Sequence, residues 1–354
     1  MAHPATRWIA VLVSGALLVG AVAAAVDRGD ESPSLSARAI DAELSTQLRP
    51  ARLARAAVTW RGGPITTTTG ETVDVRVSDA LPLETSTPEG WAEFLTGLTH
   101  GSEISTLSTY IGTLDEIQEI CGRRALGCYG RNEMVAIGEP ALADASPEEI
   151  VRHEYGHHIA FHRLNHPWAA IDWGPKRWAS AANVCARVAR KEAYPGDQGS
   201  NYARNPGEAW AETYRLMDER KAGITTASWQ IIEQSFYPSE QGLQAAELDV
   251  VQPWMKQRTT SFTRVFGKRT PKVWWTRLST PLDGELRISA TMPPGATAEV
   301  ALVSGDRKRV VRRAQWVSQR VRRLDGSICG QRSLFVRVTQ AGALGRVRVS
   351  VVTP

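Results

Sequence analysis

The 354-residue sequence has few cysteines and no more than one long hydrophobic run. Both facts restrict the class of protein to which the chain can belong. Four cysteines are too few for a fold built on a dense disulfide framework, so a hydrophobic core has to supply most of the stability. A single apolar run excludes proteins that cross a membrane several times. The chain is basic, with a net charge of +5, yet it carries no nucleic-acid-binding motif, so we expect no nucleic-acid partner.

The apolar run extends from Trp8 to Val26 and follows a short start with one arginine, Arg7. This pattern is typical of an export signal over residues 1–26. The run is long enough to span a bilayer, and Ala21-Val22-Ala23 resembles a cleavage site, so both a cleaved signal peptide and a retained membrane anchor fit the sequence. We therefore expect an exported protein, either secreted or anchored to the outer face of the cell membrane.

The strongest motif is H-E-x-x-H, which spans His153 to His157. A capping box with proline at the first helical position, Ser146-Pro147-Glu148-Glu149, predicts that a helix begins just before it. On a helix, His153 and His157 share one face and can bind one metal ion. Glu154 then lies beside the metal, where it can take a proton from the attacking water. The motif predicts one catalytic zinc ion per chain, and a chance match on a solvated helix is the alternative.

A catalytic zinc ion needs a third protein ligand. The continuation H-E-x-x-H-x-x-G-x-x-H is absent, because Ala160 and Arg163 stand where glycine and histidine are required. Further on, residues 205–212 read as a turn followed by a helix with two carboxylates four residues apart. Glu208 could reach the metal while Glu212 accepts the outer N–H of a ligand histidine. The alternative is an ordinary exposed acidic helix start, favoured by the helix dipole.

Residues 202–217, with the sequence YARNPGEAWAETYRLM, follow the H-E-Y-G-H motif. Together these two segments resemble the catalytic domain of the anthrax lethal factor family of zinc endopeptidases. That family carries H-E-F-G-H, a tyrosine shortly before a glutamate ligand, and a second glutamate four residues later in an A-E-x-x-R-L-M run. The family's large partner-binding domains have no counterpart here. The resemblance implies a gluzincin with these roles: ligands His153, His157 and Glu208, general base Glu154, and Glu212 as the partner of a ligand histidine.

The resemblance also implies that the Tyr202 hydroxyl donates to the oxyanion in the transition state. Tyr202 stands six residues before Glu208, one fewer than in the family pattern. A shorter loop could still present the phenol to the site. The alternative is an aromatic side chain that only packs.

Changes in residue composition and in the pattern of apolar residues divide the rest of the chain. Residues 27–70 are predicted to be a flexible tether that ends in a polar threonine run. Residues 71–266 mix a strand pattern with amphipathic helices and predict an α+β domain of zincin type. Its apolar strand at 133–138 directly precedes the metal helix and is either an edge strand that pairs with extended substrate or an ordinary core strand.

Residues 271–354 carry short alternating runs that predict a small all-β, jelly-roll-like sandwich. The pattern resembles the accessory domains found behind secreted bacterial peptidases. Arginines interleaved with valines at 307–313 and 320–323 make this domain basic. They fit solvated strand faces, and contact with an anionic surface is the alternative.

In an exported chain cysteines pair. Cys121 and Cys128 bracket a short loop that contains two glycines, so we expect a disulfide between them. Cys185 and Cys329 either form a second disulfide between the two domains or leave Cys185 as a buried free thiol.

The sequence as a whole predicts a monomeric, exported, zinc-dependent endopeptidase that acts on protein or peptide substrates. The alternative is a binding or adhesion protein that acts through its C-terminal sandwich and has an inactive zinc site.

Overall fold

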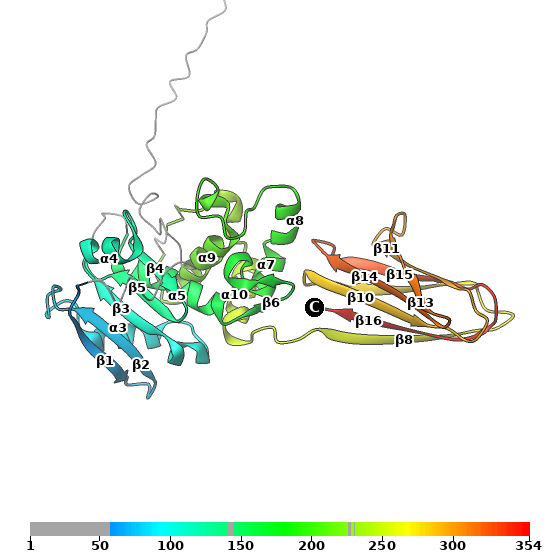
Figure 1. Ribbon diagram of the computed structural model, residues 1–354, viewed down its shortest axis with the longest axis horizontal. Helices are drawn as coiled ribbons and strands as arrows, with labels where there is room; N and C mark the ends of the chain where they lie inside the picture. Colours follow the sequence, from blue (N-terminus) through cyan, green and yellow to red (C-terminus); the bar gives the residue numbers. More distant parts are fainter. Residues whose placement is uncertain (1–56, 141–144, 226–227, 230) are drawn as a thin grey trace, which may run out of the picture. The chain divides into compact units, whose positions relative to one another are not determined.

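The computed structural model describes residues 57–354, except 141–144, 226–227 and 230. The predicted export signal and the first part of the predicted tether lie outside the described residues. Helices and open sheets are mixed (Figure 1). The buried apolar side chains form two main cores, one between Val73 and Val250 and the other between Phe266 and Val351. None of the described helices is long and apolar enough to cross a membrane.

The first core is built on a five-stranded sheet with the order β1-β2-β3-β5-β4. Strands β2, β3 and β5 run parallel, and β1 and β4 pair antiparallel with their neighbours. The predicted strand at 133–138 is therefore an interior strand, β5, and the edge next to it is β4. The strand bounds are β1 Trp60–Thr66, β2 Thr72–Ser78, β3 Ser108–Gly112, β4 Gly127–Gly130 and β5 Glu133–Ile137.

The tether prediction is wrong for residues 60–66, which form β1 and pair with β2 along their whole length. The pairing is tight at Gly62, where φ is +107° and a Cβ atom would lie 2.3 Å from the carbonyl oxygen of Val75. Only glycine fits a positive φ and such a close backbone approach. Gly62, Gly63 and Pro64 thus belong to an edge strand, where such residues are tolerated.

Helices cover this sheet and continue beyond it. The metal motif lies on α5, and the second predicted helix is α9. The helix bounds are α3 Pro88–Gly97, α4 Leu114–Cys121, α5 Pro147–Phe161, α6 Ala170–Trp173, α7 Lys176–Ala181, α8 Val184–Ala189, α9 Pro206–Lys221 and α10 Glu240–Val251. Three 3₁₀ turns lie at Ser102–Thr106, Tyr202–Arg204 and Gln234–Phe236, and a two-residue hairpin pairs β6 (Leu164–Asn165) with β7 (Trp168–Ala169).

Helices α5 and α9 pack directly on each other, and each begins where the sequence predicts. The capping box at Ser146 is present at the start of α5, and the Asn205 side chain caps α9 by accepting from the Gly207 N–H. Between the helices, a Cβ atom on Gly156 would lie only 2.8 Å from the Cα of Ala211. The indole of Trp210 donates to the Gly156 carbonyl at 2.7 Å. A residue without a side chain therefore sets the distance between the two helices.

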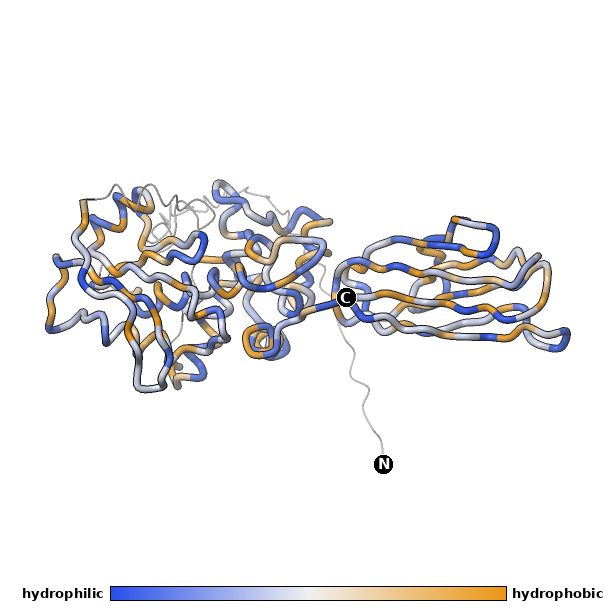
Figure 2. The backbone as a smooth tube through the Cα atoms, turned by 60° about the horizontal axis from the view of Figure 1, so that its bottom comes forward, coloured by the Kyte–Doolittle hydropathy of each residue, from blue (hydrophilic) through white to orange (hydrophobic). Residues whose placement is uncertain are grey.

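The second core is a sandwich of two antiparallel sheets, with the orders β13-β14-β10-β16-β8 and β12-β11-β15-β9. Hydrophilic and hydrophobic residues alternate along its strands (Figure 2). The sandwich begins at Arg258 rather than near 271, because β8 pairs with β16 over nine residues. The bounds are β8 Arg258–Phe266, β9 Val273–Ser279, β10 Gly284–Thr291, β11 Glu299–Ser304, β12 Val310–Arg313, β13 Gln315–Ser318, β14 Val321–Ile328, β15 Ser333–Thr339 and β16 Gly345–Thr353.

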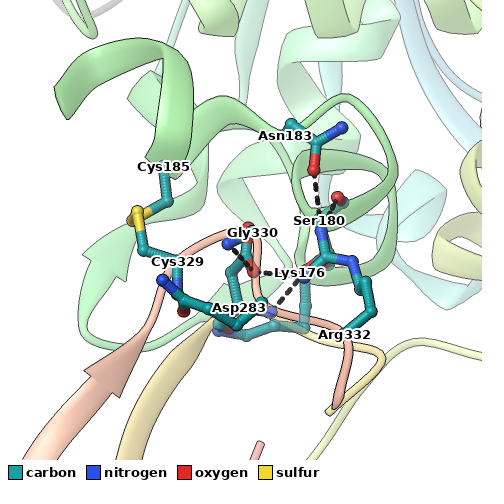
Figure 3. The surroundings of a disulfide bond; sticks show 9 residues. Lys176, Ser180, Asn183, Cys185, Asp283, Cys329, Gly330 and Arg332 are labelled. Atoms are coloured by element: carbon teal, nitrogen blue, oxygen red, sulfur yellow. Dashed lines mark hydrogen bonds and ion pairs between the residues drawn. A yellow bond between two sulfur atoms is a disulfide. The ribbon is translucent and has the colours of Figure 1, made fainter. Parts of the chain in front are cut away.

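The four cysteines form two disulfides. Cys121–Cys128 joins the end of α4 to β4, so the predicted pairing is confirmed. Cys185–Cys329 joins α8 to the loop before β15, and the free-thiol alternative for Cys185 is wrong (Figure 3). This second bond closes a long loop of chain, which restricts the unfolded state more than a short loop does.

Hydrogen bonds around Asp283 accompany the second disulfide (Figure 3). Its N–H donates to the Ser180 hydroxyl at 2.9 Å, and its carboxylate accepts from Arg332 at 2.5 Å and from the Gly330 N–H at 2.8 Å. The buried ammonium of Lys176 donates to the Asp283 carbonyl at 2.9 Å. Buried charges held by several partners are costly to separate, so this contact stabilises the connection between α7 and the sandwich.

The Gly156 contact gives a direct test of the packing of α5 on α9. Gly156→Ala should destabilise the protein by about 1–3 kcal/mol, because the added methyl meets backbone atoms that cannot move independently of their helix. Gly97→Ala is the matched control, since Gly97 is also helical and a Cβ there meets nothing within 4 Å. Thermal unfolding of both variants measures the difference. Equal stability of the two variants would contradict the close packing.

Candidate metal centre

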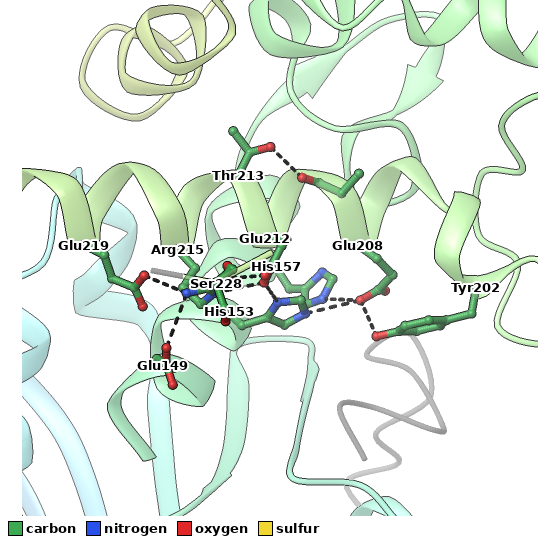
Figure 4. A network of polar contacts seen from close by, with 11 residues as sticks. Glu149, His153, His157, Tyr202, Glu208, Glu212, Thr213, Arg215, Glu219 and Ser228 are labelled. Atoms are coloured by element: carbon green, nitrogen blue, oxygen red, sulfur yellow. Dashed lines mark hydrogen bonds and ion pairs between the residues drawn. The ribbon is translucent and has the colours of Figure 1, made fainter. Parts of the chain in front are cut away.

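Three buried side chains from α5 and α9 converge on one point (Figure 4). His153 and His157 stand one turn apart on α5, and Glu208 lies in the first turn of α9. The Nε2 atoms of His153 and His157 lie 3.3 and 3.2 Å from the same Glu208 oxygen, Oε2. The possible ligand atoms of the three residues all lie within 4.8 Å of one another. Two imidazoles and one carboxylate could therefore hold a metal ion.

The spacing of these atoms fits a small tetrahedral ion. Nitrogen and oxygen ligands lie about 2.0–2.1 Å from zinc, so two ligands at the tetrahedral angle are about 3.3–3.4 Å apart. The two nitrogen-to-carboxylate distances, 3.3 and 3.2 Å, are close to this separation. Each of the three side chains is about 1 % exposed. The donor set and its geometry both fit zinc.

Glu154 is fully buried beside this cluster, and neither of its carboxylate oxygens has a hydrogen-bond partner among the described residues. Buried carboxylates are normally paired, because burial of an unpaired charge is costly. Burial raises the pKa of Glu154, and the nearby His153 and His157 only partly oppose this effect. An unpaired carboxyl with a raised pKa, close to three candidate ligands, is suited to exchange protons with a small bound molecule.

Space for the Glu154 carboxylate depends on the edge strand β4. A Cβ atom on Gly127, the first residue of β4, would lie 2.8 Å from both Cγ and Oε1 of Glu154. Any larger residue at 127 would displace the carboxylate. The disulfide at Cys128 fixes the next residue of the same strand to α4.

Glu212 lies one turn after Glu208 and accepts a hydrogen bond from Nδ1 of His153 at 3.2 Å. This contact leaves Nε2 as the metal-facing nitrogen, which is the usual arrangement of a ligand histidine and its carboxylate partner. Burial alone would raise the pKa of Glu212, but the Arg215 charge and the hydrogen bonds of His153 and Arg215 lower it to about 2. Glu212 is therefore an anion that orients His153. The alternative of an exposed acidic helix start is wrong, since Glu208 and Glu212 are both about 1 % exposed.

Arg215 is a residue that the sequence analysis did not single out. Its guanidinium is buried and binds Glu212 with two hydrogen bonds, of 3.0 and 2.6 Å, and Glu219 with one of 2.6 Å (Figure 4). It also lies 3.6 Å from Glu149, the third residue of α5. Arg215 thus connects the partner of a ligand histidine to the start of the metal helix. Its place in the A-E-x-x-R-L-M run was the available signal.

Tyr202 lies in the 3₁₀ turn before α9, and its hydroxyl donates to Oε2 of Glu208 at 3.0 Å. Part of its ring also packs against the first core. Both sequence alternatives therefore describe part of its environment: the ring packs, and the phenol reaches the ligand cluster in spite of the shortened loop.

No protein-family model and no curated protein matches the sequence. One similar solved structure is the pre-peptidase C-terminal domain of a collagenase from Bacillus anthracis, at 12 % identity and a TM-score of 0.22. The match covers 27 % of this chain and 88 % of that domain. A likeness at this level supports no conclusion about function. The functional argument therefore rests on the geometry of the site.

The two carboxylates of α9 should differ in their effect on metal binding. Glu208→Ala should remove measurable zinc affinity, because it removes a ligand. Glu212→Ala should weaken binding by about ten- to a hundredfold, the usual loss for the partner of a ligand histidine. Competition with a chromophoric chelator measures both constants. The reverse order would show that the assignment along α9 is off by one turn.

Arg215 should support both the fold and the metal site. Arg215→Met should destabilise the protein by about 3–5 kcal/mol, because it leaves buried carboxylates without their counter-charge. It should also lower zinc affinity, because Glu212 no longer holds His153. Arg152→Met is the control: it breaks a buried ion pair with Asp218, 2.9 Å apart, that does not contact Glu212. Unfolding and zinc titration should show lost stability in both variants and reduced zinc affinity only in the first.

Proposed function

We propose that the chain is an exported, zinc-dependent endopeptidase with a gluzincin-type site in a zincin-type domain. The observation that carries this proposal is the buried, unpaired Glu154 carboxylate beside three converging ligand atoms. A purely structural cluster would pair that carboxylate, since the free energy cost of leaving it unpaired brings no benefit to the fold. The resemblance of the two helical segments to the lethal factor family supports the same conclusion.

Each residue of the site has a role in peptide hydrolysis. His153, His157 and Glu208 would hold the zinc ion, and a bound zinc ion supplies Lewis-acid chemistry. Glu154 takes a proton from the attacking water and passes it to the leaving amine, for which its raised pKa is suited. Glu212 holds His153 in one tautomer. Tyr202 donates its hydroxyl to the developing oxyanion.

The position of the edge strand β4 is an argument that the substrate is a peptide. One side of β4 is unpaired within the described sheet, so an extended segment can add to it through backbone hydrogen bonds. Gly127 of this strand lies against Glu154, so a peptide paired with β4 would pass close to the general base. Strand addition recognises the interior of a chain as well as its ends, which favours an endopeptidase.

Two disulfides support the exported location, because such bonds form and persist in oxidising compartments. The apolar run at residues 8–26 supplies the signal. It lies outside the described residues, so this part of the proposal rests on the sequence.

Glu154→Gln should abolish peptide cleavage and leave about one zinc ion per chain, because it removes a general base without removing a ligand. Cleavage of casein or a peptide library, together with metal analysis of the same sample, measures both properties. Loss of zinc from the Gln variant would show that Glu154 is a ligand.

A parallel experiment, in which the wild-type chain is treated with a chelator, completes this test. Activity should disappear with chelator and return when zinc is added. A wild-type chain that binds zinc but cleaves nothing would favour the alternative of a binding protein with an inactive site.

A further inference from the structure

One stripe of helix α5 bears two residues of the candidate site and then continues past them. A helix has 3.6 residues per turn, so residues at i, i+4, i+7 and i+11 lie along one side of it. In α5 these residues are Ile150, Glu154, His157 and Phe161. The first three are buried, whereas Phe161 is 46 % exposed. The stripe with the proposed general base and one candidate ligand therefore ends in an exposed aromatic ring.

Phe161 lies one turn beyond His157. Four residues of helix extend about 6 Å along the axis, so the ring is close enough to the candidate metal centre to contact a molecule bound there. Single exposed apolar residues are common on protein surfaces. The place of Phe161 on the stripe, rather than its exposure alone, is what distinguishes it.

The same ring lies beside the edge strand β4. The ring centres of Phe161 and Tyr129, the third residue of β4, are 6.0 Å apart in an edge-to-face arrangement. Gly127, the first residue of β4, lies against Glu154. Alternate residues of a strand face the same side of a sheet, so Gly127 and Tyr129 both face α5. Strand β4 and the stripe of α5 thus run side by side from Glu154 to Phe161.

A peptide that pairs with the free edge of β4 would follow this direction. Residues directly opposite each other on neighbouring strands project to the same face of the sheet. The substrate residue opposite Tyr129 would therefore direct its side chain to the side of Phe161. The residue opposite Gly127 would lie beside Glu154, next to the bond that is cleaved. These two substrate residues are two positions apart.

We propose that Phe161 forms a subsite that selects a large apolar side chain at the third substrate residue from the cleaved bond. This inference rests on the proposed peptidase function. The ring of His162 also neighbours Phe161, with 5.3 Å between the ring centres. Burial lowers the pKa of His162, so its ring is uncharged at neutral pH and adds no preference for a charged substrate side chain.

Two peptides that differ only at this position, phenylalanine against alanine, test the inference. The wild-type chain should cleave the phenylalanine peptide with a kcat/KM at least about tenfold higher, because an apolar contact is gained. The difference should lie mainly in KM, since the contact is made before the reaction as well as during it. Phe161→Ala should reduce the ratio to less than about threefold, and Phe161→Leu should keep most of it.

Leu344→Ala is the matched control, because Leu344 is 43 % exposed and lies in the sandwich between β15 and β16. It should leave the ratio unchanged. Phe161→Arg should shift the preference at the same position to glutamate, and it also decides the matter if the alanine variant is unstable.

A wild-type ratio near one would overturn the inference and leave the peptidase proposal standing. The same holds for a ratio that Phe161→Ala does not change, or for a preference for phenylalanine that Phe161→Arg retains. If the wild-type chain cleaves neither peptide, the proposed function fails instead. Fluorescence anisotropy then measures the affinities of both peptides for the zinc-loaded chain and its variants, and the same ratios decide the inference.

Discussion

The contact between α5 and α9 at Gly156 and Ala211 is the constraint on which the candidate site depends. Two ligands lie on one helix and the third on the other, so the distance between the helices determines whether the three donors meet. A glycine facing an alanine lets the backbones approach closely, and the Trp210 indole fixes the approach by donating to the Gly156 carbonyl. Close packing of this kind has little tolerance for added volume. The geometry of the candidate ligands is thus a property of the packed core.

A buried site with several carboxylates needs positive charge or hydrogen-bond donors to offset the negative charge. Side chains of α5 and α9 supply both. Arg215 neutralises Glu212 and Glu219, and Glu212 in turn holds His153. Glu208 faces the two histidines. Of the described carboxylates named here, Glu154 alone has no hydrogen-bond partner at either oxygen. Among these described carboxylates, the unpaired one is therefore the one to which the proposed chemistry assigns the role of proton acceptor.

Local patterns in the sequence predicted the parts of the site that depend on local structure. The cap at Ser146, the i and i+4 histidines and the turn before Glu208 are short-range features, and the structure contains each of them. The role of Gly127 depends on a contact between segments far apart in the chain, which no local pattern contains. Arg215 binds Glu212 and Glu219 at i−3 and i+4 on its own helix, and what the sequence could not show is that all three side chains are buried. Strand β1 was missed because its glycines and proline hide the alternation. Strand β8 was assigned to the wrong domain because its partner, β16, is the last strand of the chain.

The glycine at the start of β4 has a consequence for the recognition of relatives. Short metal motifs recur by chance, so a sequence with H-E-x-x-H and a later glutamate is weak evidence of common ancestry. Gly127 stands 26 residues before His153 and is required by the volume of the Glu154 carboxylate. A distant homologue that keeps a glutamate in the position of Glu154 should also keep a glycine there. Divergent sequences could then be sorted by a residue that neither binds metal nor reacts.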